Sequence, residues 1–222
     1  AFISAMLMLV APIKHLSDVM APVTRGLAAV ERGIDLIEQN PVESGGRHGA
    51  AQPGLRARGE IDLDGVSLRY RDDTAPALDG VTLQVRSGET VALVGPSGAG
   101  KSTLVHLLPR FLTPTAGRIR LDGVALEDWD VATLRRQFAL VSQDVVLFND
   151  SVAANVALGA DLPPEAVRSA LKAAHLLDFV DGLPQGVDTL IGHNGSQLSG
   201  GQRQRLAIAR AICKDAPVLI LD

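Results

Sequence analysis

The chain has one cysteine, Cys213, among its 222 residues, so it can form no internal disulfide bond. No second cysteine or histidine lies near Cys213 at the spacing of metal ligands. Positive charge is also scarce: 21 Lys and Arg stand against 25 Asp and Glu, whereas nucleic-acid surfaces need clustered Lys and Arg. These shortages exclude a disulfide scaffold, argue against a nucleic-acid partner, and predict a reducing, cytosolic setting for most of the chain.

The sequence also lacks an apolar run long enough to cross a membrane by itself. The opening run, Phe2 to Val10, supplies with its neighbours about a dozen residues, whereas a membrane-spanning helix needs ~20. The chain closes on an apolar strand, Val218 to Leu221, followed only by Asp222. Because a buried strand seldom serves as a natural terminus, we expect this sequence to be a piece of a longer protein, cut at both ends.

A long helix is predicted near the start of the chain. From Ile13 to Ile37 the apolar residues recur at alternating intervals of three and four, which gives one apolar stripe. Two interpretations stay open for residues 1–39. They are either the end of a transmembrane helix with its cytoplasmic extension or an ordinary soluble amphipathic helix. Three cations beyond the apolar head favour the first through the positive-inside tendency: Lys14, Arg25 and Arg32.

A linker and a larger domain follow. Residues 40–58 are rich in glycine and proline and poor in large apolar side chains, which predicts a linker. Residues 59–222 alternate strand-like runs with helical patterns, and the last strand is fully apolar. This order predicts an α/β domain with a largely parallel core sheet. The expected strands are 61–63, 66–70, 81–85, 91–95, 118–121 and 218–221, and the expected helices are 132–137, 165–177, 200–213 and one that begins near 101.

Within this domain one segment has the form G-x-x-x-x-G-K-[ST] of a phosphate-binding loop. An apolar strand leads into it and a helix leads out, which is the context that the motif requires. Glycines let the backbone approach phosphate oxygens closely, Lys101 reaches the β- and γ-phosphates, and the Ser102 hydroxyl coordinates Mg²⁺. The predicted nucleotide-binding residues are Gly95, Pro96, Ser97, Gly98, Ala99, Gly100, Lys101, Ser102 and Thr103.

A second helix start carries two glycines. Ser199 and Gln202 have the spacing of a capping box, so the segment would begin a helix whatever its function. Capping does not explain Gly200 and Gly201, which weaken a helix but allow close backbone approach. The sequence therefore predicts two anion-binding helix starts in one domain. Both can close on one nucleotide only if a second copy of the domain faces the first.

With these two motifs the sequence resembles the ATP-binding cassette (ABC) family. The family signature matches Leu198, Ser199, Gly200, Gly201 and Gln202. The resemblance extends to three further positions. Tyr70 is similar to the aromatic residue that stacks on adenine, Gln143 to the loop glutamine that senses Mg²⁺, and Asp222 to the carboxylate at the end of the Walker B strand. The resemblance implies that Lys101 and Gln143 take part in catalysis, and that Ser102, Gln143 and Asp222 hold Mg²⁺.

The resemblance carries further expectations about the whole protein. It implies a P-loop domain with a mostly parallel core sheet, an antiparallel β subdomain and a helical subdomain, preceded by the helix that ends a transmembrane domain. The protein resembles an exporter half-transporter that binds ATP and Mg²⁺, acts as a homodimer and lies in a bacterial inner membrane with its cassette on the cytoplasmic side. Within the family the likeness is greatest to lipid A export flippases of Gram-negative bacteria, from residues that include Arg25, Gly26 and Leu27.

Alternatives and departures accompany this resemblance. A multidrug or peptide exporter, an importer-type ATPase with separate membrane subunits, and a cassette used in translation or DNA repair remain alternatives. Exporters usually carry Glu in the short loop before the signature, where this chain has His193. The family's general-base glutamate and switch histidine would follow Asp222, and the given sequence contains neither. We therefore expect this piece of chain to hydrolyse no ATP.

Overall fold

The chain divides inside the predicted linker. The computed structural model describes residues 20, 22–38, 43, 45–50, 52, 54–71, 73–160 and 162–222. Two units are distinguished by their internal contacts, Ala1–Ser44 and Gly45–Asp222. Most of the segment predicted as a linker, residues 45–58, therefore belongs to the larger unit rather than lying between two units.

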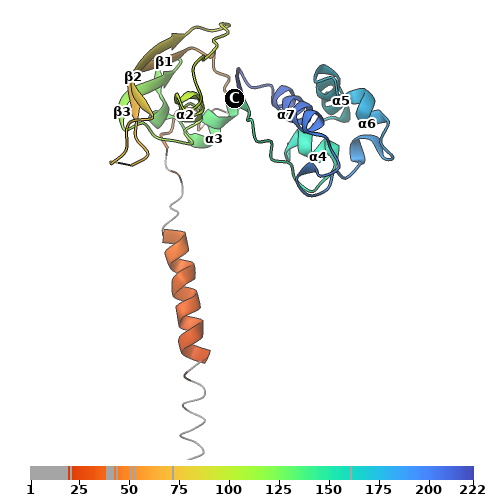
Figure 1. Ribbon diagram of the computed structural model, residues 1–222, viewed down its shortest axis with the longest axis horizontal. Helices are drawn as coiled ribbons and strands as arrows, with labels where there is room; N and C mark the ends of the chain where they lie inside the picture. The colour runs from red at the N-terminus through yellow and green to blue at the C-terminus, as the bar shows by residue number, and fades with distance from the viewer. Residues whose placement is uncertain are drawn as a thin grey trace, which may run out of the picture. The chain divides into compact units, whose positions relative to one another are not determined.

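A helix over residues 22–38 is the main element of the first unit (Figure 1, orange). Its apolar stripe is exposed, with Leu27 and Ile37 at 70% and 75% of their accessible surface. The apolar head from Phe2 to Val10, and the stripe before residue 20, lie outside the described residues. In the part of the chain that the structure describes, no helix is both long and apolar enough to cross a membrane.

An antiparallel sheet of four strands, in the order β2-β1-β3-β4, begins the second unit. Its strands are β1 (Ile61–Leu68), β2 (Leu78–Val85), β3 (Ala116–Leu121) and β4 (Val124–Ala125). The two runs predicted at 61–63 and 66–70 form this single strand β1. A register shift between Leu63 and Val66 keeps both residues on the same buried face. They are three positions apart, an odd spacing that would put them on opposite faces of a regular strand. That face packs against Leu104 and Leu107 of α2 (Lys101–Leu107), the helix that follows the P-loop.

A separate group of helices holds its own apolar core (Figure 1). The helices are α4 (Val152–Ala157), α5 (Pro164–Ala173), α6 (Leu177–Asp181) and α7 (Gly200–Lys214), with short 3₁₀ turns at Gly186–Asp188 and His193–Gly195. The helix predicted over 165–177 is divided, because His175 adopts φ 52° and the left-handed conformation ends α5. Helices α4 and α6 were not predicted, since five or six residues are too few to show a period.

A parallel pair of strands lies beside this group. β5 (Phe138–Val141) follows the 3₁₀ turn Leu126–Asp128 and helix α3 (Val131–Arg136), and it pairs in parallel with β6 (Val218–Leu221). Ala139 and Val141 of β5 pack against Ala207 and Ala211 of α7. The predicted α/β fold class, with parallel strands, an antiparallel subdomain and a helical subdomain, is confirmed. Among the described residues the parallel part consists of β5 and β6.

The prediction of a strand at residues 91–95 is wrong for this structure. The segment has no strand hydrogen bonds, and Val94 is 92% exposed. An apolar run becomes a strand only when another strand lies beside it, and no described segment pairs with residues 91–95. The segment is apolar, as the sequence shows, but an apolar pattern does not indicate whether another strand lies beside it.

Candidate nucleotide-binding site

The loop before α2 has a shape that glycine permits. Gly98 and Gly100 have φ 82° and 84°, and a Cβ on Gly100 would collide with the carbonyl oxygen of Ala77. Lys101 folds back over the loop, where its Nζ donates to the carbonyl oxygens of Gly95 at 3.0 Å and Pro96 at 2.8 Å. The ammonium group is therefore held against the loop whose amides would bind phosphate.

A hydroxyl and a carboxylate from distant parts of the chain meet beside this loop. The Oγ of Ser102 donates to Oδ1 of Asp222 at 2.7 Å, although 120 positions separate them. Pairing between β5 and β6 brings Asp222 there, since its amide donates to the carbonyl oxygen of Val141 at 2.9 Å. These two oxygens are hard ligands of the type that Mg²⁺ prefers, with phosphates and water completing its shell. Among the described residues no cluster of three His, Cys, Asp or Glu could hold a metal alone.

Lys101 and Asp222 also share a cleft. It has a volume of about 720 Å³ and lies between residues 91–93 and the exposed edge of β6. Most of its wall is apolar, and its charged lining residues are Glu89, Lys101 and Asp222. The cleft therefore brings the P-loop lysine and the carboxylate at the end of β6 to the same cavity.

Tyr70 follows β1 and reaches the same helix start. Its hydroxyl lies 3.1 Å from Oγ1 of Thr103, the third residue of α2. The residue is 61% exposed, so the ring remains accessible to a flat ligand. The structure thus places the predicted adenine-stacking residue next to the predicted phosphate loop. This proximity could not be derived from a separation of 33 positions alone.

The second helix start has the predicted cap. The amide of Gln202 donates to Oγ of Ser199 at 3.3 Å, and the amide of Ser199 donates to Oε1 of Gln202 at 2.7 Å. Gly200 and Gly201 are exposed and have ordinary helical φ angles, and a Cβ at either position would meet nothing closer than 3.8 Å. Packing against the described residues therefore does not require glycine here, although glycine costs about 1 kcal/mol in a helix. The backbone amides of Gly200 and Gly201 are therefore accessible to a ligand or to a second protein chain.

Gln143 lies in a different cleft from Lys101 and Asp222. That cleft has a volume of about 570 Å³ and is formed by residues 143–146 together with Asn194, Gly200, Arg203 and Gln204. The structure therefore brings Gln143 to the signature helix α7, while Ser102 and Asp222 pair with each other. The predicted grouping of Gln143 with these two as Mg²⁺ ligands stays a prediction. His193 begins the 3₁₀ turn before the signature, and its side chain is exposed.

A family model described as "ABC transporter" matches residues 78–222, about two thirds of the chain. The chain belongs to the ABC transporter family. This cassette is 39% identical to a bacterial Atm1-family ABC exporter solved with ATP bound, with a TM-score of 0.80 over 90% of this chain and 34% of that one. The fold and the two motifs are therefore those of an ABC nucleotide-binding domain, and ATP is the ligand that the family implies.

Curated relatives match along the whole chain, beyond the cassette. An ATP-dependent lipid A-core flippase from Ralstonia nicotianae is 59% identical and one from Dechloromonas aromatica is 54% identical, in both cases over 100% of this chain. The chain covers 37% and 38% of these two proteins. It therefore spans little more than a third of the length of the relatives that it matches.

Two residues that sequence reasoning missed hold the loop after Gln143 to the signature helix of the cassette. Asn155 is fully buried, and its side chain bonds both the amide and the carbonyl of Phe148, at 2.8 and 3.0 Å. Arg210 of α7 donates to the carbonyl oxygens of Asn155 and Val146 at 2.9 and 3.1 Å. Burial lowers the pKa of Arg210, but the guanidinium stays charged. No sequence motif or spacing indicates a role for either residue, and only their hydrogen bonds in the folded structure show it.

Replacing Tyr70 by Ala is expected to weaken ATP binding and leave tripolyphosphate binding unchanged. Loss of one base-stacking ring costs about 1–3 kcal/mol in nucleic-acid sites, and tripolyphosphate has no base. Isothermal titration with both ligands measures the difference. Tyr70→Phe is the matched control, because it removes only the hydroxyl that contacts Thr103 and keeps the ring. Equal losses for both ligands in Tyr70→Ala would mean that Tyr70 supports the loop rather than the base.

Proposed function

We propose that the full-length protein is an ATP-driven exporter that moves lipid A-core across the bacterial inner membrane, with this cassette on the cytoplasmic side. The observation that supports this proposal is that the similarity to the curated flippases extends over the whole of this chain. The flippases are 53–59% identical over this chain from end to end, including the 77 residues ahead of the part that the family model matches. A likeness confined to the cassette would support any ABC ATPase. A likeness that includes the N-terminal helix favours this exporter type.

In this proposal each site residue has a defined role toward ATP. Lys101 leaves the carbonyl oxygens of Gly95 and Pro96 and pairs with the β- and γ-phosphates, while the loop amides bind the phosphate oxygens. Ser102 and Asp222 hold Mg²⁺, which neutralises charge that develops on the phosphates. Tyr70 stacks on the adenine ring.

The proposal also assigns a role to the bare signature helix. Gly200 and Gly201 leave the amides at the start of α7 exposed, and packing against the residues that the structure describes does not account for the two glycines. In a homodimer these amides would bind the phosphates held by the P-loop of the other copy. Two cassettes then enclose two ATP molecules, and the attached helices move when the cassettes close. Gln143, in the cleft beside α7, would sense whether nucleotide and signature have come together.

Lipid dependence of ATP turnover distinguishes this function from its alternatives. The full-length protein would be reconstituted in phospholipid vesicles with and without lipid A-core, and phosphate release measured in both. We expect lipid A-core to stimulate turnover in a saturable way, and cationic drugs and peptides to have no such effect. Lys101→Ala serves as the control for contaminating ATPases. Stimulation by drugs or peptides and not by lipid A-core would favour the multidrug or peptide exporter instead.

A further inference from the structure

Residues 45–57 do not behave as a free linker; the described ones (45–50, 52 and 54–57) form a strap along the surface of the cassette. The amides of Gly46 and His48 donate to the carbonyl oxygens of Glu127 and Asp128 at 2.9 and 3.0 Å. The His48 ring packs edge-on against Trp129, with 4.4 Å between centroids. A Cβ on Gly46 would collide with the backbone of Asp128, so the strap approaches more closely than any other residue permits.

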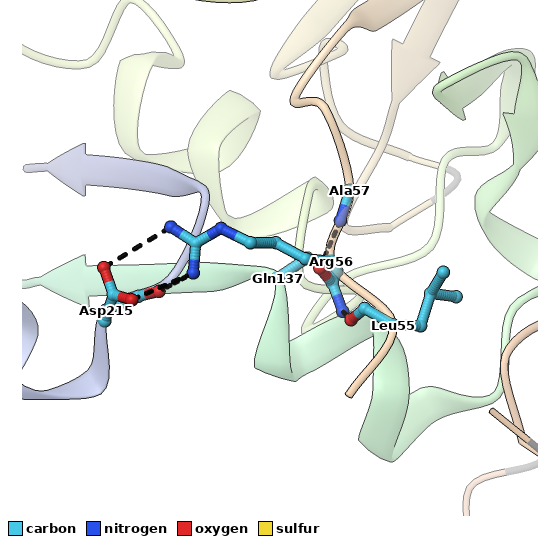
Figure 2. Close-up of polar contacts among 5 residues, drawn as sticks. All are labelled: Leu55, Arg56, Ala57, Gln137 and Asp215. Carbon is cyan, nitrogen blue, oxygen red and sulfur yellow. Dashed lines mark hydrogen bonds and ion pairs between the residues drawn. The ribbon is translucent and has the colours of Figure 1, made fainter. Parts of the chain in front are cut away.

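A buried glutamine fixes the other end of the strap. Gln137 is 1% exposed, and its Oε1 accepts the amide of Ala57 at 2.8 Å while its Nε2 donates to the carbonyl oxygen of Leu55 at 2.9 Å (Figure 2). The main-chain oxygen of the same residue accepts the amide of Val218, the first residue of β6, at 3.1 Å. Gln137 therefore joins the strap to the strand that leads to Asp222.

Arg56, between the Leu55 and Ala57 that Gln137 binds, contacts the C-terminal end of the signature helix α7. Arg56 donates from Nη1 to the main-chain oxygen of Asp215 at 2.6 Å and to its carboxylate at 3.0 Å (Figure 2). Asp215 is the left-handed C-cap of α7, whose N-cap is Ser199. Lys214, the last residue of α7, donates to the carbonyl oxygen of Arg135 at 2.9 Å, which fixes the helix end to α3. Arg56 therefore joins the strap to the helix that begins at the signature.

We propose that Arg56 and Gln137 are positioning residues that couple the strap to the nucleotide site through α7 and β6. Both elements have one end at the strap and the other at the site, at the N-cap Ser199 of α7 and at Asp222, which directly follows β6. A shift of either element on ATP-driven closure displaces the strap, and with it whatever the chain attaches ahead of residue 45. The functional part of this inference rests on the proposed function, in which closure moves the attached helices.

The Arg56–Asp215 ion pair is too exposed to contribute much to the stability of the fold, so a role in coupling can be tested separately from stability. Arg56 and Asp215 have side chains that are 55% and 82% exposed, and exposed ion pairs add little to the stability of a fold. Arg56→Ala is therefore a mild change for folding but removes the contact between the strap and α7. The exposed pair of Arg168 and Asp181, which joins α5 to α6 at 2.9 Å, offers a matched control at a distance in sequence from both strap and signature.

Hydrogen exchange at the amide of Ala57, with and without saturating Mg-ATP, tests the coupling in the full-length protein. In the wild type we expect ATP to increase the protection of this amide. In Arg56→Ala the increase is expected to fall by about fivefold, the factor that corresponds to one exposed ion pair. Because coupling between two sites is reciprocal, the ATP dissociation constant should rise by no more than about the same fivefold, far less than a change in the P-loop itself would cause. Arg168→Ala should behave as wild type, and Arg56→Lys, which keeps a cation that can donate to the main-chain oxygen and the carboxylate of Asp215, should keep part of the ATP response.

Each outcome decides one question. An ATP response that is the same in wild type and Arg56→Ala would overturn the coupling, and so would a response in Arg168→Ala that falls as far as the response in Arg56→Ala. Gln137→Glu gives an independent check, because it keeps the acceptor for the amide of Ala57 and replaces the donor to the carbonyl oxygen of Leu55 by an acceptor. This variant should lose more of the ATP response than Arg56→Ala does. Phosphate release, measured separately, tests the proposed function. A protein that binds ATP and shows the strap response but hydrolyses none would contradict the ATPase and leave the coupling standing.

Discussion

Lys101→Ala is expected to reduce ATP affinity on the order of 100-fold, the largest effect of any single change in this site. The side chain would contribute charge-assisted hydrogen bonds to two phosphates, each worth about 1.5–3 kcal/mol, and tenfold in affinity is about 1.4 kcal/mol. Its removal also leaves the carbonyl oxygens of Gly95 and Pro96, which Lys101 now binds, facing the incoming phosphates without a cation between them.

Isothermal titration of the full-length protein with Mg-ATP measures this loss. Lys172→Ala is a suitable control, because it removes the same charge from an exposed position on α5. The folded state would be checked by thermal unfolding. It should change little, since among the residues that the structure describes the Lys101 ammonium bonds only its own loop. Unchanged affinity in Lys101→Ala would mean that the glycine-rich loop does not bind phosphate.

Replacement of Ser199 by Ala together with Gly201 by Asp is expected to abolish ATP-dependent closure of the cassettes without weakening ATP binding to one cassette. The aspartate places a negative charge where the proposed dimer presents amides to phosphate, and the alanine removes a capping oxygen. Within the chain the aspartate is tolerated, since its Cβ has space and acidic residues favour the first turn of a helix. Loss of the cap costs about 1 kcal/mol of helix stability, so the variant should still fold, and the loss of closure should come from the site of the partner's nucleotide.

Spin-label distances between the two copies of the full-length protein, with and without Mg-ATP, report the closure. The wild type should show a shorter distance with ATP, and the double variant should show none. Lys172→Glu changes the charge of an exposed site on the same subdomain and should close normally. Normal ATP-dependent closure in the double variant would exclude a nucleotide site shared between two copies.

The candidate site was predictable to different degrees in its different parts. The P-loop is one continuous segment whose glycines and lysine act through local geometry, as the positive φ of Gly98 and Gly100 confirms. The capping box from Ser199 to Gln202 is also local and was predicted from spacing. By contrast, the apolar pattern of residues 91–95 predicts a strand, yet no described segment forms strand hydrogen bonds with them. A strand requires hydrogen bonds from a second segment, which a local pattern cannot supply.

Sequence by itself predicted the phosphate loop and the capped signature helix, because each depends on residues within one loop or one helical turn. It also determined the family and the α/β class, from the order of the motifs and apolar patterns along residues 59–222. Only the tertiary structure placed Ser102 against Asp222, Tyr70 against Thr103, and Gln143 beside the signature helix. It alone showed that Gln137 and Asp215 hold a segment whose composition is that of a linker. Glycine and proline reveal where a chain can turn, whereas docking depends on which distant donors and acceptors the fold brings within about 3 Å.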